Sequence, residues 1–164
     1  IGEIEQKRAL LKKDSCDLAA ELSVTLEEFK SRIEKNSLKI ESRISGKSFI
    51  VLGDKDKIHQ VFVNLIDNAI KFNKPEGKIV VSADQNPEGV TITIEDAGIG
   101  ISEEAQRRVF ERFFRADKTR SKELGGTGLG LAIVKNALEA IHGTIEVESE
   151  IGVGTTFTVS MPKG

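Results

Sequence analysis

The chain has 164 residues, and its 24 lysines and arginines against 26 aspartates and glutamates leave a formal net charge of −2. A chain of this length can bury a hydrophobic core that is stable without disulfides or bound metals. The near-neutral charge argues against a protein that coats nucleic acid or an anionic membrane, because either partner requires a large basic excess. A single cysteine, Cys16, excludes an internal disulfide, and His59 and His142 lack the spacing of a zinc site.

No apolar run approaches the roughly 20 residues that span a bilayer, and we find no signal peptide. The first residue is Ile1 rather than Met, which we interpret as a cut through a longer protein. The absence of a membrane segment here therefore says nothing about that parent protein.

The first half of the chain predicts helices and short strands in turn. Residues 1–13 are typical of the end of a helix that begins upstream. Asp14 or Ser15 is expected to cap a helix over 17–35, where apolar residues recur at steps of three and four. Residues 38–44 and 48–52 then predict two short strands.

A second helix is expected to begin after Asp54 and to end near Asn73, with one apolar face toward the core. The alternating segments 78–83 and 89–95 predict an antiparallel hairpin, and the residues between them favour a connection longer than a two-residue turn. We find no internal repeat, linker or low-complexity segment.

The stretch from residue 96 to residue 127 is predicted to be irregular, apart from a helical piece from Ser102 to about Phe114. So long a connection inside a compact domain is usually functional or mobile. A third helix over 131–142 and a final hairpin with turn glycines Gly152 and Gly154 complete the chain.

The second helix carries a polar row as well as an apolar face. Asn64, Asn68 and Lys71 lie within about 60° of one another on a helix, and Gln60 and Asp67 extend the row. Asparagine is a poor helix former, and a solvated face would favour Glu, Lys or Arg. A side-chain amide offers an oxygen to a hard cation and a nitrogen to phosphate. At this point a solvated face and a cation or phosphate site both remain open.

The motif EDAGIGIS combines a carboxylate at the end of a strand with two glycines. Gly98 and Gly100 permit a sharp turn and the close approach of a flat ligand, and Asp96 could accept a hydrogen bond from the exocyclic amine of a purine. An ordinary Asp-Gly turn also explains the motif, and it is the preferred interpretation when this motif is considered alone.

Glycines 125, 126, 128 and 130 lead directly into the third helix. A glycine-rich loop before a helix presents unpaired N–H groups to an anion, for which phosphate is expected. The sequence does not contain the better-known phosphate-binding motifs. Both Gly-Lys pairs lack the earlier glycine of a Walker loop, Leu131 replaces the third glycine of a dinucleotide fingerprint, and no Asp-Phe-Gly motif is present.

Residues 107–123 carry seven basic and three acidic side chains. The interleaved phenylalanines would suit a nucleic-acid patch, but the rest of the chain provides no wider basic face, so we expect no nucleic-acid partner. A flexible cationic lid over a polyphosphate explains both the charge and the flanking glycines.

Four segments in order resemble the N, G1, F and G2 boxes of the ATP-binding catalytic domain of bacterial sensor histidine kinases. These segments are HQVFVNLIDNAIKF, EDAGIGIS, VFERFFR and GGTGLGLAIVK, and the resemblance extends from about residue 17 to residue 162. It implies the Bergerat fold of the superfamily that includes DNA gyrase and MutL. That fold is α/β: a two-layer α/β sandwich, with a mixed sheet of about five strands, helices on one face and a mobile ATP lid.

The resemblance also implies roles for residues. Asn68 would coordinate Mg²⁺ between the phosphates of ATP, Asn64 and Lys71 would contact the phosphate region, and Asp96 would bind the adenine amine. Phe72 stands where many relatives carry Tyr, so stacking near the base is retained and a hydroxyl contact is lost.

Arg115 is implied in charge stabilisation during phosphoryl transfer, which makes Asn64, Lys71 and Arg115 the expected catalytic residues. Ile70, Ile99, Ile101 and Leu131 could line the base, although plain core packing explains each of them at least equally well. The remaining implied nucleotide-binding positions are Gly98, Gly100, Ile101, Gly126, Thr127, Gly128, Leu129, Gly130 and Leu131.

One position distinguishes branches of the superfamily. Where this chain has Asn64, gyrase and MutL carry a Glu that activates water, and an amide cannot act as that general base. Asn64 therefore favours phosphotransfer over hydrolysis, unless a neighbour such as His59 substitutes as the base.

The family's phosphoacceptor histidine lies on a separate dimerisation domain, and neither His59 nor His142 fits that role. We therefore interpret residues 1–13 as the end of that domain's second helix and residues 14–164 as the catalytic domain. The resemblance implies transfer from Mg-ATP to the missing histidine, relay to a response regulator, and a parent homodimer. It also implies a cytoplasmic domain, with anchoring of the parent in the inner membrane left open. A nucleotide-sensing module without chemistry and a gyrase-type ATPase remain as alternatives.

Overall fold

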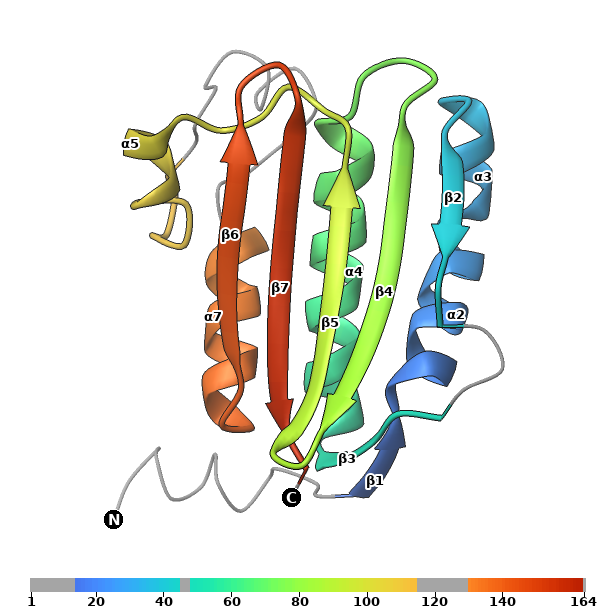
Figure 1. The fold of residues 1–164 in the computed structure, drawn as a ribbon, viewed down its shortest axis with the longest axis vertical. Helices are drawn as coiled ribbons and strands as arrows, with labels where there is room; N and C mark the ends of the chain where they lie inside the picture. Colours follow the sequence, from blue (N-terminus) through green and yellow to red (C-terminus); the bar gives the residue numbers. More distant parts are fainter. Residues whose placement is uncertain (1–13, 45–47, 115–129, 164) are drawn as a thin grey trace.

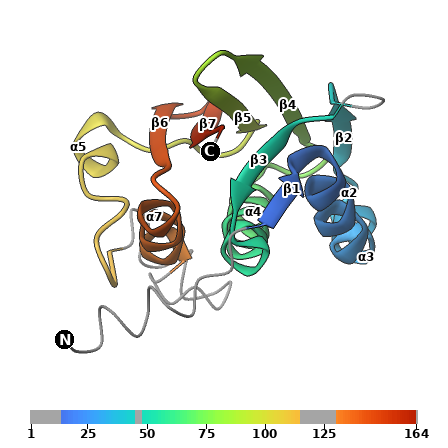
Figure 2. The same ribbon diagram turned by 90° about the horizontal axis from the view of Figure 1, so that it is seen from below.

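The computed structural model describes residues 14–44, 48–114 and 130–163, and within them one mixed sheet carries helices on a single face (Figures 1 and 2). The strand order is β2-β4-β5-β7-β6; β2 and β4 are parallel, and every other neighbouring pair is antiparallel. The strands of this sheet are β2 (Lys39–Ser42), β4 (Lys78–Asn86), β5 (Gly89–Asp96), β6 (Thr144–Glu150) and β7 (Gly154–Pro162). This is the predicted α/β architecture of two layers.

Figure 2 shows the main helices below the sheet and a short helix beside its β6 edge. The helices are α2 (Leu18–Glu28), α3 (Lys30–Lys35), α4 (Lys55–Lys71), α5 (Glu103–Gln106) and α7 (Gly130–Ala140). None of the helices in the described part of the chain is long and apolar enough to cross a membrane.

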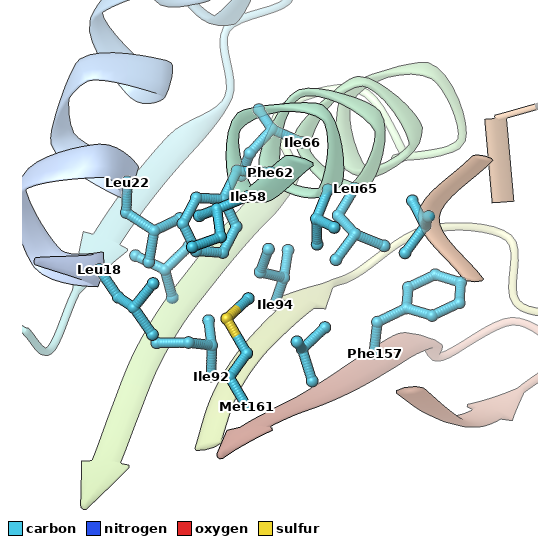
Figure 3. Close-up of a cluster of buried hydrophobic side chains, with 14 of the residues drawn as sticks. Leu18, Leu22, Ile58, Phe62, Leu65, Ile66, Ile92, Ile94, Phe157 and Met161 are labelled. Atoms are coloured by element: carbon cyan, nitrogen blue, oxygen red, sulfur yellow. The ribbon is translucent and has the colours of Figure 1, made fainter. Parts of the chain in front are cut away.

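The core lies between α4 and the sheet (Figure 3). Helix α4 begins as predicted, because the Asp54 side chain accepts hydrogen bonds from the N–H groups of Asp56 and Lys57. Its apolar face is completely buried against α2, β5 and β7. The side chains labelled in that cluster are Leu18, Leu22, Ile58, Phe62, Leu65, Ile66, Ile92, Ile94, Phe157 and Met161. This packing leaves the polar row of α4 on another side of the helix.

The start of the described chain differs from the prediction. Residues Asp14–Asp17 form strand β1, which pairs with β3 (Ile50–Gly53) in a separate two-stranded sheet. The predicted strand at 48–52 therefore exists but lies outside the main sheet. Neither Asp14 nor Ser15 caps the next helix, because Asp17 does so, accepting from the N–H of Ala19 and also from the N–H of Phe49.

The single helix expected over 17–35 is two helices, α2 and α3, with a break at Phe29. The break is only one residue long, and the N–H of Ile33 still donates to the Phe29 carbonyl at 2.9 Å. The apolar stripe therefore continues through the break, which is why the periodicity does not reveal it.

The hairpin of β4 and β5 turns more tightly than predicted. Asn86 pairs directly with Gly89, so two residues form the turn. The side-chain oxygen of Asn86 accepts from the N–H groups of Glu88 and Gly89, both at 2.9 Å. This Asx-type bonding stabilises the turn. The last residues of β4 are polar and exposed, so the sequence there resembles a loop and the strand is predicted to end too early.

The helix expected over 102–114 is also shorter in the structure. Ser102 caps α5, but after Gln106 the chain continues in turns with bonds between residues three apart, and Phe113 has a φ of 64°. Tertiary contacts explain the change, because Val109 is buried and the ring of Phe110 packs edge-on against that of Phe157 at 6.4 Å. The third helix and the final hairpin form essentially as predicted.

Candidate functional site

The motifs converge at one end of the sheet. The C-terminal end of α4, the C-terminal end of β5 and the turn between β6 and β7 lie together at the top of Figure 1. Helix α7 packs beside α4, and an ideal Cβ on its first residue, Gly130, would lie 3.3 Å from Oδ1 of Asn64. Segments far apart in the sequence therefore form one site.

Asn64 lies beside the start of α7. Its side chain is half-buried, and Nδ2 donates to the Gln60 carbonyl at 2.7 Å. The first N–H groups of a helix have no partner within that helix and attract anions. The half-buried amide and the start of α7 therefore lie close enough to contact one anion, and a phosphate bound there stays a prediction.

Asn68 and Lys71 lie further along the polar row of α4. The side chain of Asn68 is half-buried and makes no hydrogen bond to any described residue. Lys71 Nζ lies 3.0 Å from Oδ2 of Asp67, and Asp67 Oδ1 accepts from Arg32 on α3 at 2.8 Å. Sequence reasoning missed Arg32, because nothing short-range in the sequence links α3 to α4.

The side chains of this site suit a cation that is bound mainly by phosphate oxygens better than one that is bound by protein ligands alone. Within residues 14–44, 48–114 and 130–163, no group of three His, Cys, Asp or Glu side chains could hold a metal ion. Asn68 offers one amide oxygen, which suits Mg²⁺ bound mainly through phosphate oxygens and water.

Asp96 provides the other chemical feature of the site. It ends β5, pairs with Thr155 on β7 and is only 8% exposed. Burial raises the pKa of its carboxyl to about 6, although the backbone N–H groups of Gly98 and Thr155 act in the opposite direction. Asp96 is therefore mostly ionised at pH 7 and can accept a hydrogen bond from a ligand amine.

The loop after Asp96 is held by backbone contacts. The N–H of Gly98 donates to Asp96 Oδ1 at 2.9 Å, and the N–H of Ile99 donates to the Phe72 carbonyl at 3.1 Å. A Cβ on Gly98 would lie 2.0 Å from that carbonyl oxygen; Gly100 has a φ of 77°, and a Cβ there would lie 2.2 Å from the Glu150 carbonyl oxygen. At both glycines the close neighbour is the chain itself, so their contact with a flat ligand stays a prediction.

Ile101 is held by residues that the motifs do not include. Its N–H donates to Ser149 Oγ at 2.7 Å, and its carbonyl accepts from Gln106 Nε2 at 2.8 Å. Ser149 Oγ also bonds to Gly154 and Thr155. Because Ile101 and Ser149 are far apart in the chain, no local pattern could have predicted this contact.

The apolar candidates differ in their surroundings. Ile70 is buried in the core cluster, which supports the packing interpretation. Phe72, Ile99, Ile101 and Leu131 are half-buried and remain candidates for contact with a ligand. Five predicted site residues lie outside the described residues, namely Arg115, Gly126, Thr127, Gly128 and Leu129.

Comparison with known proteins identifies the family. Residues 53–164 match the model of the family described as histidine kinase-, DNA gyrase B-, and HSP90-like ATPase. The chain belongs to this ATPase family. The predicted superfamily is therefore confirmed, and ATP is the nucleotide that its name associates with this domain.

Named relatives of this ATPase domain are sensor kinases. It is 44% identical over 133 residues to the sensor-like histidine kinase SenX3 of Mycobacterium tuberculosis, covering 80% of this chain and 32% of SenX3. The chain thus spans about a third of the length of this relative.

Solved structures confirm the fold. A mycobacterial sensor histidine kinase, MprB, superposes with a TM-score of 0.82 at 30% identity, covering 91% of this chain and 97% of that one. The histidine kinase ThkA, in complex with the response regulator protein TrrA, superposes with a TM-score of 0.75 at 25% identity, covering 94% of this chain and 42% of that one. The ATPase domain described here therefore has the fold of histidine kinase catalytic domains.

Proposed function

We propose that this chain is the catalytic domain of a two-component sensor histidine kinase. It binds Mg-ATP and transfers the γ-phosphoryl group to a histidine on a separate dimerisation domain. The bond from the γ-phosphorus to the bridging oxygen breaks, a bond to an imidazole nitrogen forms, ADP leaves, and the imidazole gives up one proton to solvent. The phosphoryl group then passes to an aspartate of a response regulator.

The observation that carries this proposal is an amide, not a carboxylate, beside the start of α7. Asn64 lies there with Oδ1 close to Gly130, and an amide cannot remove a proton from water at neutral pH. His59 is not placed to take over as the base, because it lies five residues before Asn64 on α4, about 140° around the helix axis, and its Nε2 is 3.5 Å from a Glu28 carboxylate oxygen on α2. Both features support transfer to a protein acceptor over hydrolysis.

Each part of the nucleotide has a proposed partner. Asp96 accepts from the adenine amine, and its burial excludes competing water. Asn68 would hold Mg²⁺ through its amide oxygen, and the ion would neutralise phosphate charge. Lys71 and the N–H groups at the start of α7 bind the phosphates. Arg115 stabilises the charge that develops during transfer.

The remaining ligand positions also have proposed roles. Gly126, Thr127, Gly128 and Leu129 contact the phosphates as the G2 motif predicts. Gly98, Gly100, Ile101, Phe72 and Leu131 surround the base, while Gly130 begins the helix that faces the phosphates.

We also propose how this chain is placed within its parent protein. Residues 1–13, which lie outside the described residues, are proposed to belong to the end of the dimerisation domain, through which the parent forms a homodimer, and residues 14–164 to form the catalytic domain. A response regulator is the proposed downstream partner, in agreement with the ThkA–TrrA complex. We place the domain in the cytoplasm, with the parent able to be anchored in the inner membrane.

The test combines this chain with the parent's dimerisation domain and ATP labelled at the γ-phosphate. We expect acid-labile label on the dimerisation domain with the wild-type chain and at least a tenfold lower rate with Asn68→Ala. Asn136→Ala, which changes an exposed asparagine on α7, is the matched control and should label normally. Repeated release of phosphate that requires Asn68 but gives no phosphohistidine would instead indicate a gyrase-type ATPase. ATP binding without either reaction, while the intact parent is also inactive, would indicate a nucleotide-sensing module.

A further inference from the structure

A charged residue from outside the recognised motifs reaches the polar row of α4. Arg32, on α3, donates to Asp67 Oδ1 at 2.8 Å, and Lys71 Nζ lies 3.0 Å from Asp67 Oδ2. The guanidinium of Arg32 also lies over the ring of Phe29, 5.2 Å from its centroid. One carboxylate therefore binds two cations, one at each oxygen. We call Arg32, Asp67 and Lys71 the charge triad.

The charge triad is partly shielded from water. Asp67 and Lys71 have side-chain exposures of 24% and 22%, whereas Arg32 is 42% exposed. Charges in such surroundings attract one another more strongly than fully hydrated ones. Two cations and one anion leave one unit of positive charge where Lys71 meets the row of Asn64 and Asn68.

The second cation changes what Lys71 can do. With Lys71 alone, Asp67 would cancel its charge, and moving Lys71 toward another anion would leave a half-buried carboxylate unpaired. An unpaired charge in such a position is costly. Because Arg32 stays on Oδ1, Asp67 keeps a partner when Lys71 turns toward a ligand.

We propose that Arg32 is a positioning residue for polyphosphate binding. It holds Asp67, so that Lys71 can exchange its bond to Asp67 for a bond to a phosphate oxygen. Arg32 acts through Asp67 and does not itself contact the nucleotide. This inference rests on the proposed function, because it assumes that Lys71 meets the phosphates of ATP.

Calorimetry of this chain with Mg-ATP and with adenosine tests the proposal. Replacing Arg32 with Met should weaken Mg-ATP binding about threefold to fivefold, as expected for a partly exposed ion pair, and should leave adenosine binding unchanged. Arg32→Lys should recover most of the loss. Arg43→Met, which removes an exposed arginine paired with Glu41, is the matched control and should change neither affinity.

A double-mutant cycle then separates indirect from direct action. Asp67→Asn should strengthen Mg-ATP binding by releasing Lys71, and in that background Arg32→Met should change the affinity less than twofold. An equal loss with and without Asp67 would overturn the proposal, because Arg32 would then act on the phosphates directly. Equal losses for Mg-ATP and adenosine would also overturn it, because they indicate general damage to the fold.

The inference and the proposed function fail in different ways. Normal Mg-ATP binding by the wild type together with unchanged binding by Arg32→Met would overturn the role of Arg32 alone. Failure of the wild-type chain to bind Mg-ATP would overturn both. Thermal unfolding of each variant confirms that the proteins compared are folded.

Discussion

The two ends of the candidate site are built in different ways. The carboxylate end, Asp96 with residues 97–101, is held by backbone groups: the N–H groups of Gly98 and Ile99 bond to Asp96 and to the Phe72 carbonyl. The amide end, which comprises the α4 row and the start of α7, consists of half-buried side chains. Asn64 bonds to its own helix, and Lys71 bonds to Asp67.

These differences matter for the two parts of a nucleotide. A backbone-held carboxylate is preorganised, so it can select a base without losing conformational entropy on binding. Side chains that exchange partners suit a phosphate group whose charge changes when ATP becomes ADP. On the proposed function, the carboxylate end would recognise the base and the amide end would respond to the phosphates. Substitutions at the two ends should therefore have different signatures.

The largest effect is expected from Gly98→Ala, which would break the carboxylate end. The new Cβ would meet the Phe72 carbonyl oxygen at 2.0 Å, and neither backbone segment can move without breaking hydrogen bonds. We expect a loss of about 2–3 kcal/mol in the free energy of unfolding and at least a tenfold loss of adenosine affinity, measured by urea unfolding and calorimetry.

Gly89→Ala is the matched control for that substitution. A Cβ there would approach the Met161 carbonyl oxygen as closely as the Cβ at position 98 would approach that of Phe72, but Gly89 begins β5 at the opposite end of the strand from Asp96. Stability should fall by a similar amount while adenosine affinity stays unchanged. Wild-type adenosine affinity in Gly98→Ala would show that the carboxylate end is not rigid.

Asp96→Asn should separate binding from stability at the carboxylate end. Losing a charged acceptor should weaken adenosine binding about tenfold to a hundredfold. The same change should stabilise the fold at pH 8, by up to about 3 kcal/mol, because the amide carries no buried charge. Glu95→Gln, on an exposed neighbour, should leave adenosine affinity unchanged.

The pH dependence of Asp96 follows from its raised pKa. Burial moves the pKa from 3.8 to about 6, so the folded chain binds this proton more tightly than the unfolded chain. The protonated Asp96 carboxyl contributes fully to the free energy of unfolding below pH 4, and this contribution is lost as the pH rises through 6. The stability gain of Asp96→Asn should therefore be absent at pH 4 and should level off above pH 7 in urea unfolding.

The adenosine affinity of the wild type should rise with pH, whereas the contribution of Asp96 to stability falls with pH. Its affinity should fall as the pH is lowered through about 6, because the protonated carboxyl loses part of its capacity to accept. Adenosine is the suitable probe, since phosphate groups ionise in the same range. A flat profile between pH 5 and pH 8 would contradict the role of Asp96 in recognising the base.

The smallest effect is expected from Gly130→Ala at the amide end. Its Cβ would meet the end of the Asn64 side chain at 3.3 Å, and that amide can rotate away. Alanine also favours the helix, so stability should rise by up to about 0.5 kcal/mol. Mg-ATP affinity should fall only about twofold to threefold, with adenosine unchanged. A tenfold loss of Mg-ATP affinity in calorimetry would show that the amide end is as rigid as the carboxylate end.

Much of this site was predictable because its motifs are local. The row of Asn64, Asn68 and Lys71 follows from helical periodicity alone, and the helix forms as predicted. A strand ending at Asp96 and a glycine before a helix at Gly130 are likewise short-range patterns. The order of these motifs also predicted the family that the comparisons confirm.

Features that depend on more distant parts of the chain were not predictable. Strand β1 forms only because β3 lies beside it. The helix expected over 102–114 is shortened after Gln106, where Phe110 packs against Phe157 and Gln106 bonds to Ile101 and Ser149. Such contacts contribute nothing to local periodicity, so a pattern of adjacent residues cannot reveal them.

The sequence by itself determined the α/β class and the chemistry of the site, which combines a polar helical row with a carboxylate at a strand end. The tertiary structure decided which residues support them, since it brought Arg32 to Asp67 and Ser149 to Ile101. The physical reason is the range of each effect. Side-chain spacing along one helix or strand is dictated by backbone geometry, whereas a partner from another element is selected only when the core packs.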